Sequence, residues 1–173
     1  MTATTAEAPT LVTEKLYAFG QATPADVPRI ARLLRECAPE TIPVDPETLR
    51  EQWRSFHVVR APGYGVIAAA AVFPIEDGRC ELRSVAVDDA WRGHGLGAKL
   101  VRRAMLRALA AGRQLVCVTL EPGFFERLGF FEIPLDFLPD KPERGQAVDG
   151  RPRVAMAWPT RAVFTPEAER SET

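Results

Sequence analysis

Residues 84–97 read S-V-A-V-D-D-A-W-R-G-H-G-L-G, and this stretch indicates the fold more clearly than any other. It begins in an apolar strand that ends at Val87 and continues through a loop that contains Arg92. Glycines 93, 95 and 97 then lead into residues 95–111, whose apolar side chains recur at helical spacing. Glycines let a ligand approach the backbone closely, and a helix N-terminus offers unpaired N–H groups with partial positive charge. The stretch therefore predicts a cradle for a phosphate or pyrophosphate group.

Basic residues surround this predicted cradle. Residues 91–113 contain no acidic residue but hold Arg92, Lys99, Arg102, Arg103, Arg107 and Arg113. Arg92 lies inside the loop and is the best candidate for an anion ligand, whereas Arg107 and Arg113 fit a solvated helix face. No G-K-S/T follows the glycines, so this is not a Walker loop. It is not a dinucleotide fingerprint either. That motif follows the first strand of a parallel unit, whereas here three strands precede the strand that leads into the glycines.

The rest of the chain alternates strand-like and helix-like segments. Apolar runs bounded by turn signals predict strands over 16–19, 56–60, 66–73, 80–87, 115–120, 130–133 and 154–158. Proline-plus-cap signals and helical spacing predict helices over 24–36, 46–53, 95–111 and 122–128. This order predicts an α/β (α+β) fold with a mixed sheet and helices on its faces. Strand 80–87, helix 95–111 and strand 115–120 form a β-α-β crossover, so the two strands should be parallel neighbours.

The composition is that of one globular domain. The chain has 173 residues, 46% of them hydrophobic, and a net charge of −1, which argues against nucleic-acid or membrane-surface binding. We expect a single domain over 15–158, a flexible N-terminal arm over 1–14 and a flexible C-terminal tail over 159–173. No apolar run reaches the roughly 18 residues of a membrane span, and no secretory signal is visible. Three scattered cysteines without a C-x-x-C predict no disulfide framework, no metal site and a cytoplasmic location.

Three further segments extend the motif. Residues 81–87 read E-L-R-S-V-A-V, residues 119–130 read T-L-E-P-G-F-F-E-R-L-G-F, and residues 138–141 read L-P-D-K. Together with the R-x-x-G-x-G of Arg92, Gly95 and Gly97, they resemble the Gcn5-related N-acetyltransferase (GNAT) family. The resemblance covers roughly residues 15–158 and is greatest for the short, N-acetylglutamate-synthase-like branch. It implies a GNAT fold, with a sheet of about six to seven strands and about four helices, and acetyl-CoA as co-substrate.

The resemblance also implies where acetyl-CoA binds. In this family the backbone amides of the loop bind the pyrophosphate, here those of Arg92, Gly93, His94, Gly95, Leu96 and Gly97. The pantetheine arm pairs like an added strand with the backbone of Val85, Ala86 and Val87, so these side chains matter little. Phe125 is expected to line the acyl slot or to pack on the cofactor.

The implied chemistry is direct transfer of the acetyl group to an amine, which must lose a proton before it attacks. Glu81 is placed as the proton-accepting carboxylate is in the family. Many relatives carry a tyrosine on the helix after the fifth strand that protonates the CoA thiolate, but residues 124–126 read F-F-E here. Arg83 and Lys141 are candidate ligands for an acceptor carboxylate, and Thr119 is a candidate contact with the acceptor. Arg83 should lie on the same sheet face as Glu81.

The acceptor remains open between several classes. The expected acceptor is a small-molecule amine, in particular an amino acid such as glutamate. The sequence departs from the resembled branch after Lys141, where that branch continues with a tryptophan and two cysteines. An antibiotic, a toxic amino-acid analogue or a polyamine is therefore a second class of acceptor. A sensor module that binds acyl-CoA without turnover is a third hypothesis. Relatives often dimerise through their C-terminal strands, so the resemblance also allows a homodimer.

Overall fold

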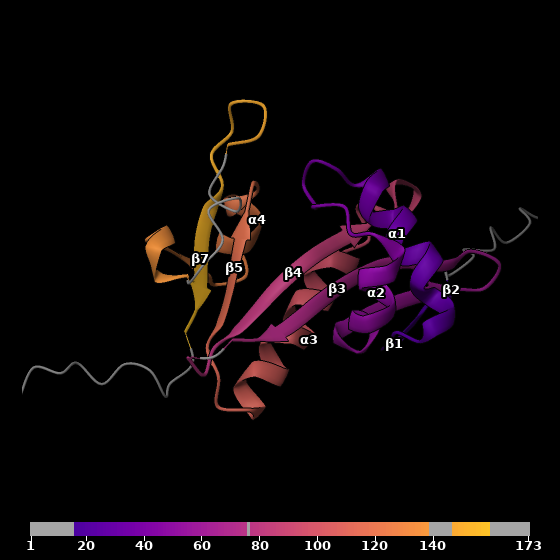
Figure 1. The fold of residues 1–173 in the computed structure, drawn as a ribbon, viewed down its shortest axis with the longest axis horizontal. Helices are drawn as coiled ribbons and strands as arrows, with labels where there is room; N and C mark the ends of the chain where they lie inside the picture. Colours follow the sequence, from indigo (N-terminus) through magenta and orange to yellow (C-terminus); the bar gives the residue numbers. More distant parts are fainter. Residues whose placement is uncertain (1–15, 76, 139–146, 160–173) are drawn as a thin grey trace, which may run out of the picture.

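A mixed seven-stranded sheet forms the centre of the computed structural model, which describes residues 16–75, 77–138 and 147–159 (Figure 1). Within these residues the strand order is β1-β2-β3-β4-β5-β7-β6. The strands are β1 (Ala18–Gln21), β2 (Phe56–Ala61), β3 (Gly65–Pro74), β4 (Cys80–Val87), β5 (Leu115–Thr119), β6 (Phe131–Ile133) and β7 (Val154–Trp158). The helices are α1 (Val27–Glu36), α2 (Pro46–Gln52), α3 (Leu96–Ala110) and α4 (Pro122–Glu126), with single 3-10 turns η1 (Pro24–Asp26), η2 (Trp53–Ser55), η3 (Asp89–Trp91) and η4 (Leu135–Phe137).

The predicted fold class and order of elements are confirmed. β4 and β7 have the predicted bounds, and α3 is one residue shorter at each end than the predicted helix. β1 begins two residues later than the predicted strand, at Ala18. The predicted N-terminal arm over 1–14 and Lys141 lie outside the described residues. So does the predicted C-terminal tail, apart from its first residue.

Side-chain caps fix the starts of the first two helical segments. The backbone N–H of Thr23 donates to the Asp26 carboxylate over 2.7 Å, and the Thr23 hydroxyl donates to the same oxygen over 2.8 Å. Asp45 caps α2, because its carboxylate accepts from the backbone N–H of Thr48 over 2.9 Å. These contacts satisfy backbone donors that have no partner inside the helix. Both cap-plus-proline signals in the sequence are thereby confirmed.

The sheet separates two hydrophobic cores. One core lies between the sheet and α3, and its members include Leu96, Leu100 and Met156. The other lies under α1 and α2 and includes Ile30, Leu34 and other side chains with almost no exposed surface. Figure 1 shows α1 and α2 on the near face and α3 behind the sheet. β4 contributes side chains to both cores, so it is packed on both of its faces.

β4 and β5 are parallel neighbours, as predicted, but only over a short distance. They pair at Cys80↔Leu115, Glu81↔Val116 and Leu82↔Cys117, and no later residues of the two described strands pair. β5 continues to pair with β7 as far as Thr119↔Val154. Beyond Leu82 the sheet therefore divides into two parts, and in Figure 1 β5 and β7 turn away from β4. The backbone of β4 is open to a ligand on that side.

Candidate active site

A cleft of about 670 Å³ opens where β4 and β5 separate. The predicted site residues that line it are Arg83, Val85, Ala86, Val87, Arg92, Gly93, Gly95, Leu96, Gly97, Thr119 and Phe125. The cleft thus brings together the end of β4, the glycine-rich loop, the end of β5 and α4. The residues that line the cleft without having been predicted as site residues include Cys37, Glu40 and Glu121.

A bulge in β4 turns its backbone toward the cleft. The register with β3 shifts between Ala71↔Arg83 and Ala69↔Ala86, so two residues of β4 lie opposite one residue of β3. Ser84, inside the bulge, has a φ of 55°, which is rare for a residue other than glycine. Bulges of this kind redirect side chains next to functional sites. The bulge could not be predicted, because no glycine marks it in the sequence.

The glycine-rich loop has the predicted form of an anion cradle. Gly93 and Gly95 have φ values of 79° and 71°, which favour glycine. Gly95 is the N-cap of α3, and its carbonyl accepts the backbone N–H of Lys99 over 3.0 Å. The first amides of α3, beginning at Leu96, therefore have no partners within the helix. They can donate to a phosphate.

Gly97 lines the cleft, and there the absence of a side chain matters rather than a left-handed backbone conformation. Its φ is not in the left-handed region, so its backbone does not require glycine. A Cβ atom at this position would lie 3.6 Å from both Phe124 and Val87, which also line the cleft. The absence of a side chain at Gly97 keeps the space between these two side chains open.

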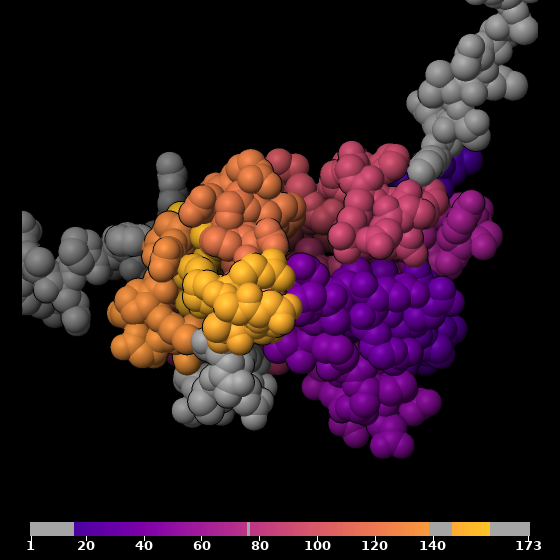
Figure 2. Space-filling model, turned by 90° about the horizontal axis from the view of Figure 1, so that it is seen from above, coloured from indigo at the N-terminus to yellow at the C-terminus, as the bar shows by residue number. Residues whose placement is uncertain are grey.

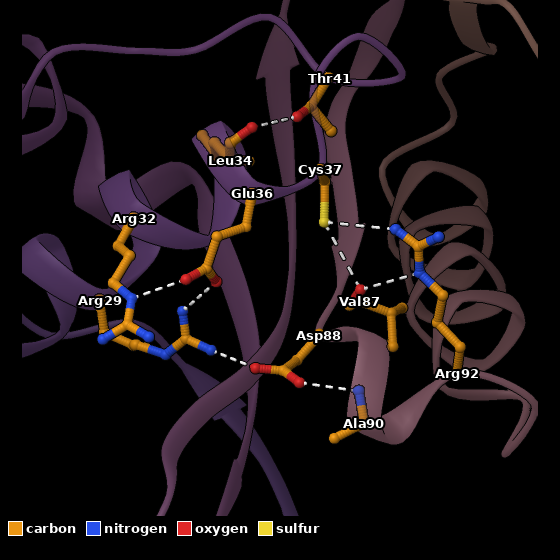
Figure 3. A network of polar contacts seen from close by, with 10 residues as sticks. All are labelled: Arg29, Arg32, Leu34, Glu36, Cys37, Thr41, Val87, Asp88, Ala90 and Arg92. Atoms are coloured by element: carbon orange, nitrogen blue, oxygen red, sulfur yellow. Dashed lines mark hydrogen bonds and ion pairs between the residues drawn. The ribbon is translucent and has the colours of Figure 1, made fainter.

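A polar network ties α1 to the loop that follows β4 (Figure 3). Arg29 pairs with the carboxylate of Asp88, and that carboxylate also accepts the backbone N–H of Ala90 over 3.0 Å. The Arg92 side chain donates to the carbonyl oxygen of Val87 over 3.4 Å and lies 3.8 Å from the sulfur of Cys37. Arg92 is thus held at the mouth of the cleft, next to the part of β4 where the sequence predicted the pantetheine arm.

Glu81 and Arg83 lie on the same face of β4, as predicted. Glu81 is buried with 4% of its surface exposed, and its carboxylate pairs with the Arg83 guanidinium. The Arg83 guanidinium also lies 4.7 Å from the centre of the Phe73 ring. Its Nε is buried and has no hydrogen-bond acceptor among the described residues. Arg83 reaches the cleft, whereas Glu81 lies behind it and does not line the cleft.

Arg151 bridges two carboxylates beside the cleft. Its guanidinium lies 3.0 Å from the carboxylate of Glu121, before α4, and 3.5 Å from that of Glu40, after α1. In Figure 2 the yellow C-terminal segment lies against the indigo N-terminal half of the chain, as this bridge requires. The sequence could not reveal this contact, because 111 positions separate Glu40 from Arg151.

Thr119 and Cys117 occupy the β5 side of the cleft. The Thr119 hydroxyl oxygen accepts the backbone N–H of Glu121 over 2.9 Å. Burial, and to a smaller degree the Glu81 carboxylate, raises the pKa of the Cys117 thiol well above its usual range. Cys117 is therefore a neutral thiol and a weak nucleophile.

His94 lies in the glycine-rich loop, but its side chain does not line the cleft. Its Nδ1 lies 3.1 Å from the carbonyl oxygen of Trp91 and 3.0 Å from that of Arg92. The imidazole therefore contacts the backbone of its own loop. The described residues contain no group of three or more His, Cys, Asp or Glu side chains arranged to hold a metal ion.

Comparison with known proteins establishes the family. The model of the acetyltransferase (GNAT) domain matches residues 52–132. An uncharacterized N-acetyltransferase of Chlorobaculum tepidum is 32% identical over 120 residues, which cover 68% of this chain and 77% of that protein. The chain belongs to the GNAT acetyltransferase family. The predicted family is confirmed, and this chain is an N-acetyltransferase of the acetyl-CoA-dependent GNAT type.

Two further proteins that are similar to this chain have names that refer to the acetylation of amino acids. An amino-acid acetyltransferase of Mycobacterium tuberculosis is 37% identical over 113 residues, which cover 63% of this GNAT acetyltransferase and 65% of that protein. The N-acetylglutamate synthase of Neisseria gonorrhoeae, solved with coenzyme A and N-acetyl-glutamate, has the same fold, with a TM-score of 0.71 and 22% identity. That match covers 84% of this chain and 35% of the synthase. Within the described residues, no helix of this GNAT acetyltransferase has both the length and the apolar character needed to cross a membrane.

Proposed function

We propose that this GNAT acetyltransferase acetylates the amino group of an amino acid and that Arg83 binds the acceptor's carboxylate. The observation that carries the proposal is Arg83 itself, which lines the cleft where β4 and β5 separate. Glu81 is the one carboxylate that pairs with Arg83 among the described residues, so the five-donor guanidinium has further N–H groups for a second carboxylate. The names of two relatives, an amino-acid acetyltransferase and an N-acetylglutamate synthase, support an amino acid as the acceptor, with glutamate as the first to test.

The cofactor is proposed to lie along the cleft from the glycine-rich loop to the β4 bulge. The amides at the start of α3 and the Arg92 guanidinium bind the pyrophosphate. The pantetheine arm then pairs with the exposed backbone of Val85 and Val87, which the separation of β5 leaves open. For this the Arg92 side chain must leave the Val87 carbonyl, which it contacts in the free protein.

Glu81 is proposed to take the proton of the acceptor ammonium. In the free protein its carboxylate pairs with Arg83, which shields it from the cleft. When the acceptor carboxylate shares the same guanidinium, the hold of Arg83 on Glu81 weakens. Glu81 can then accept the ammonium proton, directly or through one water molecule. The neutral amine attacks the thioester carbonyl, the C–S bond breaks, and the second proton lost by the amine nitrogen passes to the departing CoA thiolate, so that the products are the N-acetyl amide and free CoA thiol.

The environment of the cysteines in the cleft supports direct transfer of the acetyl group from acetyl-CoA to the acceptor, without an acetyl-enzyme. A transfer through an acetyl-enzyme would require a thiolate beside the thioester. Cys117 is buried with its pKa raised, and Cys37 lies near the loop, at the carbonyl of Val87. Cys117 is thus not an activated nucleophile, and the Cys37 thiol donates to the Val87 carbonyl oxygen over 3.5 Å. Thr119, at the end of β5, is proposed to contact the acceptor.

A second class of acceptor is favoured by Glu40 and Glu121. Both carboxylates line the cleft, and a cationic acceptor such as a polyamine or an aminoglycoside could displace Arg151 from them. The positive charge of Arg83 within the same cleft opposes such an acceptor. The amino acid therefore remains the leading proposal.

The proposal is tested by thiol release from acetyl-CoA with a panel of amino acids, polyamines and aminoglycosides. We expect turnover with an amino acid. Glu81→Gln should then lower kcat by about 100-fold or more, since proton transfer typically contributes that much. Arg83→Lys, which keeps a charge beside Glu81, should raise the acceptor KM by about tenfold or more and leave the acetyl-CoA KM unchanged. Arg50→Ala, at an exposed position of α2, is the control. Turnover with polyamines alone would overturn the proposal.

A further inference from the structure

A row of cations on α3 lies over the rings of Tyr17, which precedes β1, Phe19 of β1 and His57 of β2, outside the active-site cleft. The Lys99 amine donates to the Tyr17 hydroxyl over 2.7 Å and lies 5.3 Å from the centre of that ring. The Arg103 guanidinium lies 4.5 Å from the centre of the Phe19 ring. One turn further along α3, Arg107 contacts the imidazole of His57 on β2.

The geometry of helix and strand produces this row. Cations four residues apart on an α-helix are about 6 Å apart along its axis. Residues two apart on a strand are about 6.6 Å apart and lie on the same face. Tyr17 and Phe19 are two apart, and Gln21 continues the row opposite His57. Each cation therefore meets its own partner, and the row forms a continuous basic surface.

This surface carries positive charge that nothing in the described part of the chain neutralises. Lys99, Arg103 and Arg107 form no ion pair with a described carboxylate, whereas Arg29, Arg60 and Arg83 each do. His57 adds no negative charge. Burial, followed by the charges of Arg107 and Arg103, lowers its pKa to about 4, so the imidazole is neutral at pH 7.

A cavity of about 240 Å³ opens within the row. It is lined by Phe19, Gly20, Gln21, His57, Val58, Leu100 and Arg103. It shares no lining residue with the active-site cleft. Its lining combines apolar side chains with a guanidinium and an imidazole, and the Arg107 guanidinium lies against that imidazole. An apolar recess edged by guanidinium groups that form no ion pair with a described carboxylate is complementary to an organic anion.

We propose that this cavity is a second ligand site, which binds a small organic anion. Arg103 and Arg107 bind its carboxylate or phosphate group, and Phe19 and Leu100 contact its apolar part. The proposal is independent of the acceptor in the active-site cleft. The site lies on α3, the same helix whose first turn is proposed to bind the pyrophosphate.

The two histidines of the chain give a test that separates the two sites. The His94 imidazole contacts the backbone of the glycine-rich loop and reports on that loop, and His57 reports on the second site. The imidazole NMR signals are followed while inorganic phosphate or benzoate is added to protein saturated with CoA, at constant ionic strength set with chloride. We expect the His57 signals to shift and saturate with at least one of the two anions, while the His94 signals do not move. Saturation with phosphate alone would indicate a phosphate ester as ligand, and saturation with benzoate would indicate an organic carboxylate.

Variants on α3 complete the test. Arg103→Gln combined with Arg107→Gln should weaken the apparent affinity at His57 by about tenfold or more. Arg102→Gln, an exposed position of the same helix outside the row, is the matched control and should leave the affinity unchanged. Stabilisation by CoA in thermal unfolding shows that each variant is folded. A linear His57 response equal to that of chloride, or an equal loss of affinity in Arg102→Gln, would overturn the proposal.

Discussion

Replacing Gly97 by alanine should separate cofactor binding from stability. In the free protein the added methyl group meets Phe124 and Val87 at 3.6 Å, an ordinary contact distance. Alanine is also a better helix residue than glycine, by up to about 1 kcal/mol. Gly97→Ala should therefore leave the free energy of unfolding unchanged or raise it slightly.

The same methyl group should weaken binding of acetyl-CoA. Gly97, Val87 and Phe124 all line the cleft, and the methyl group fills the space between them. Extra atoms in a filled site typically cost about 1–3 kcal/mol. That cost corresponds to an increase of about 5-fold to 150-fold in the Kd for CoA.

Gly95→Ala is the matched comparison, because its cost arises in the free protein. A Cβ at Gly95 meets no atom within 4 Å, but the φ of 71° is strained for alanine by roughly 1–2 kcal/mol. Its Tm should fall by about 2–8 °C. Calorimetric titration with CoA and thermal unfolding measure both variants. If Gly97→Ala binds CoA like the wild type, or unfolds more easily than Gly95→Ala, the space at Gly97 does not serve the cofactor.

Three further predictions concern the scaffold. Leu34→Ala, at a fully buried position of α1, should cost about 2–5 kcal/mol in urea unfolding and leave the CoA affinity unchanged. Asp88→Ala removes both the ion pair with Arg29 and the cap of η3, so it should cost about 1–2 kcal/mol and weaken CoA binding in the same titration. The lowered pKa of His57 means that the unfolded chain binds the proton more tightly than the folded protein does. The stability that the neutral His57 contributes is complete above pH 6.5 and is lost as the pH falls toward 4. His57→Asn should therefore reduce the loss of stability between pH 6.5 and pH 4 by about 1–2 kcal/mol, as measured by unfolding at several pH values.

The parts of the fold that depend on local pattern could be predicted from the sequence. Apolar runs predicted the strands, and the pairs Thr23-Pro24 and Asp45-Pro46 predicted the helix starts. Gly95 was predicted to open a helix in an anion cradle, because a glycine directly before an amphipathic segment lets a ligand approach the unpaired amides of the first turn. The shared face of Glu81 and Arg83 followed from strand alternation.

Features that depend on the tertiary fold could not be predicted. The bulge at Ser84 has a positive φ without a glycine, so no residue type marks it. Arg151 meets its carboxylates only after the chain has returned across the cleft. The contact between Arg107 of α3 and His57 of β2 could not be predicted either, because 50 positions separate the two residues in the sequence.

The proposed recognition of the acceptor is best tested by comparing the best amino-acid acceptor with its carboxamide in the acetyl-transfer assay. The carboxamide keeps the reacting amine but lacks the charge that Arg83 is proposed to bind. Loss of a charge-assisted hydrogen bond costs about 1.5–3 kcal/mol, so kcat/KM should fall by about 10-fold to 150-fold. In Arg83→Lys the difference between the two acceptors should shrink. Equal kcat/KM values for acid and amide with the wild-type enzyme would contradict the proposed recognition of an amino acid through its carboxylate.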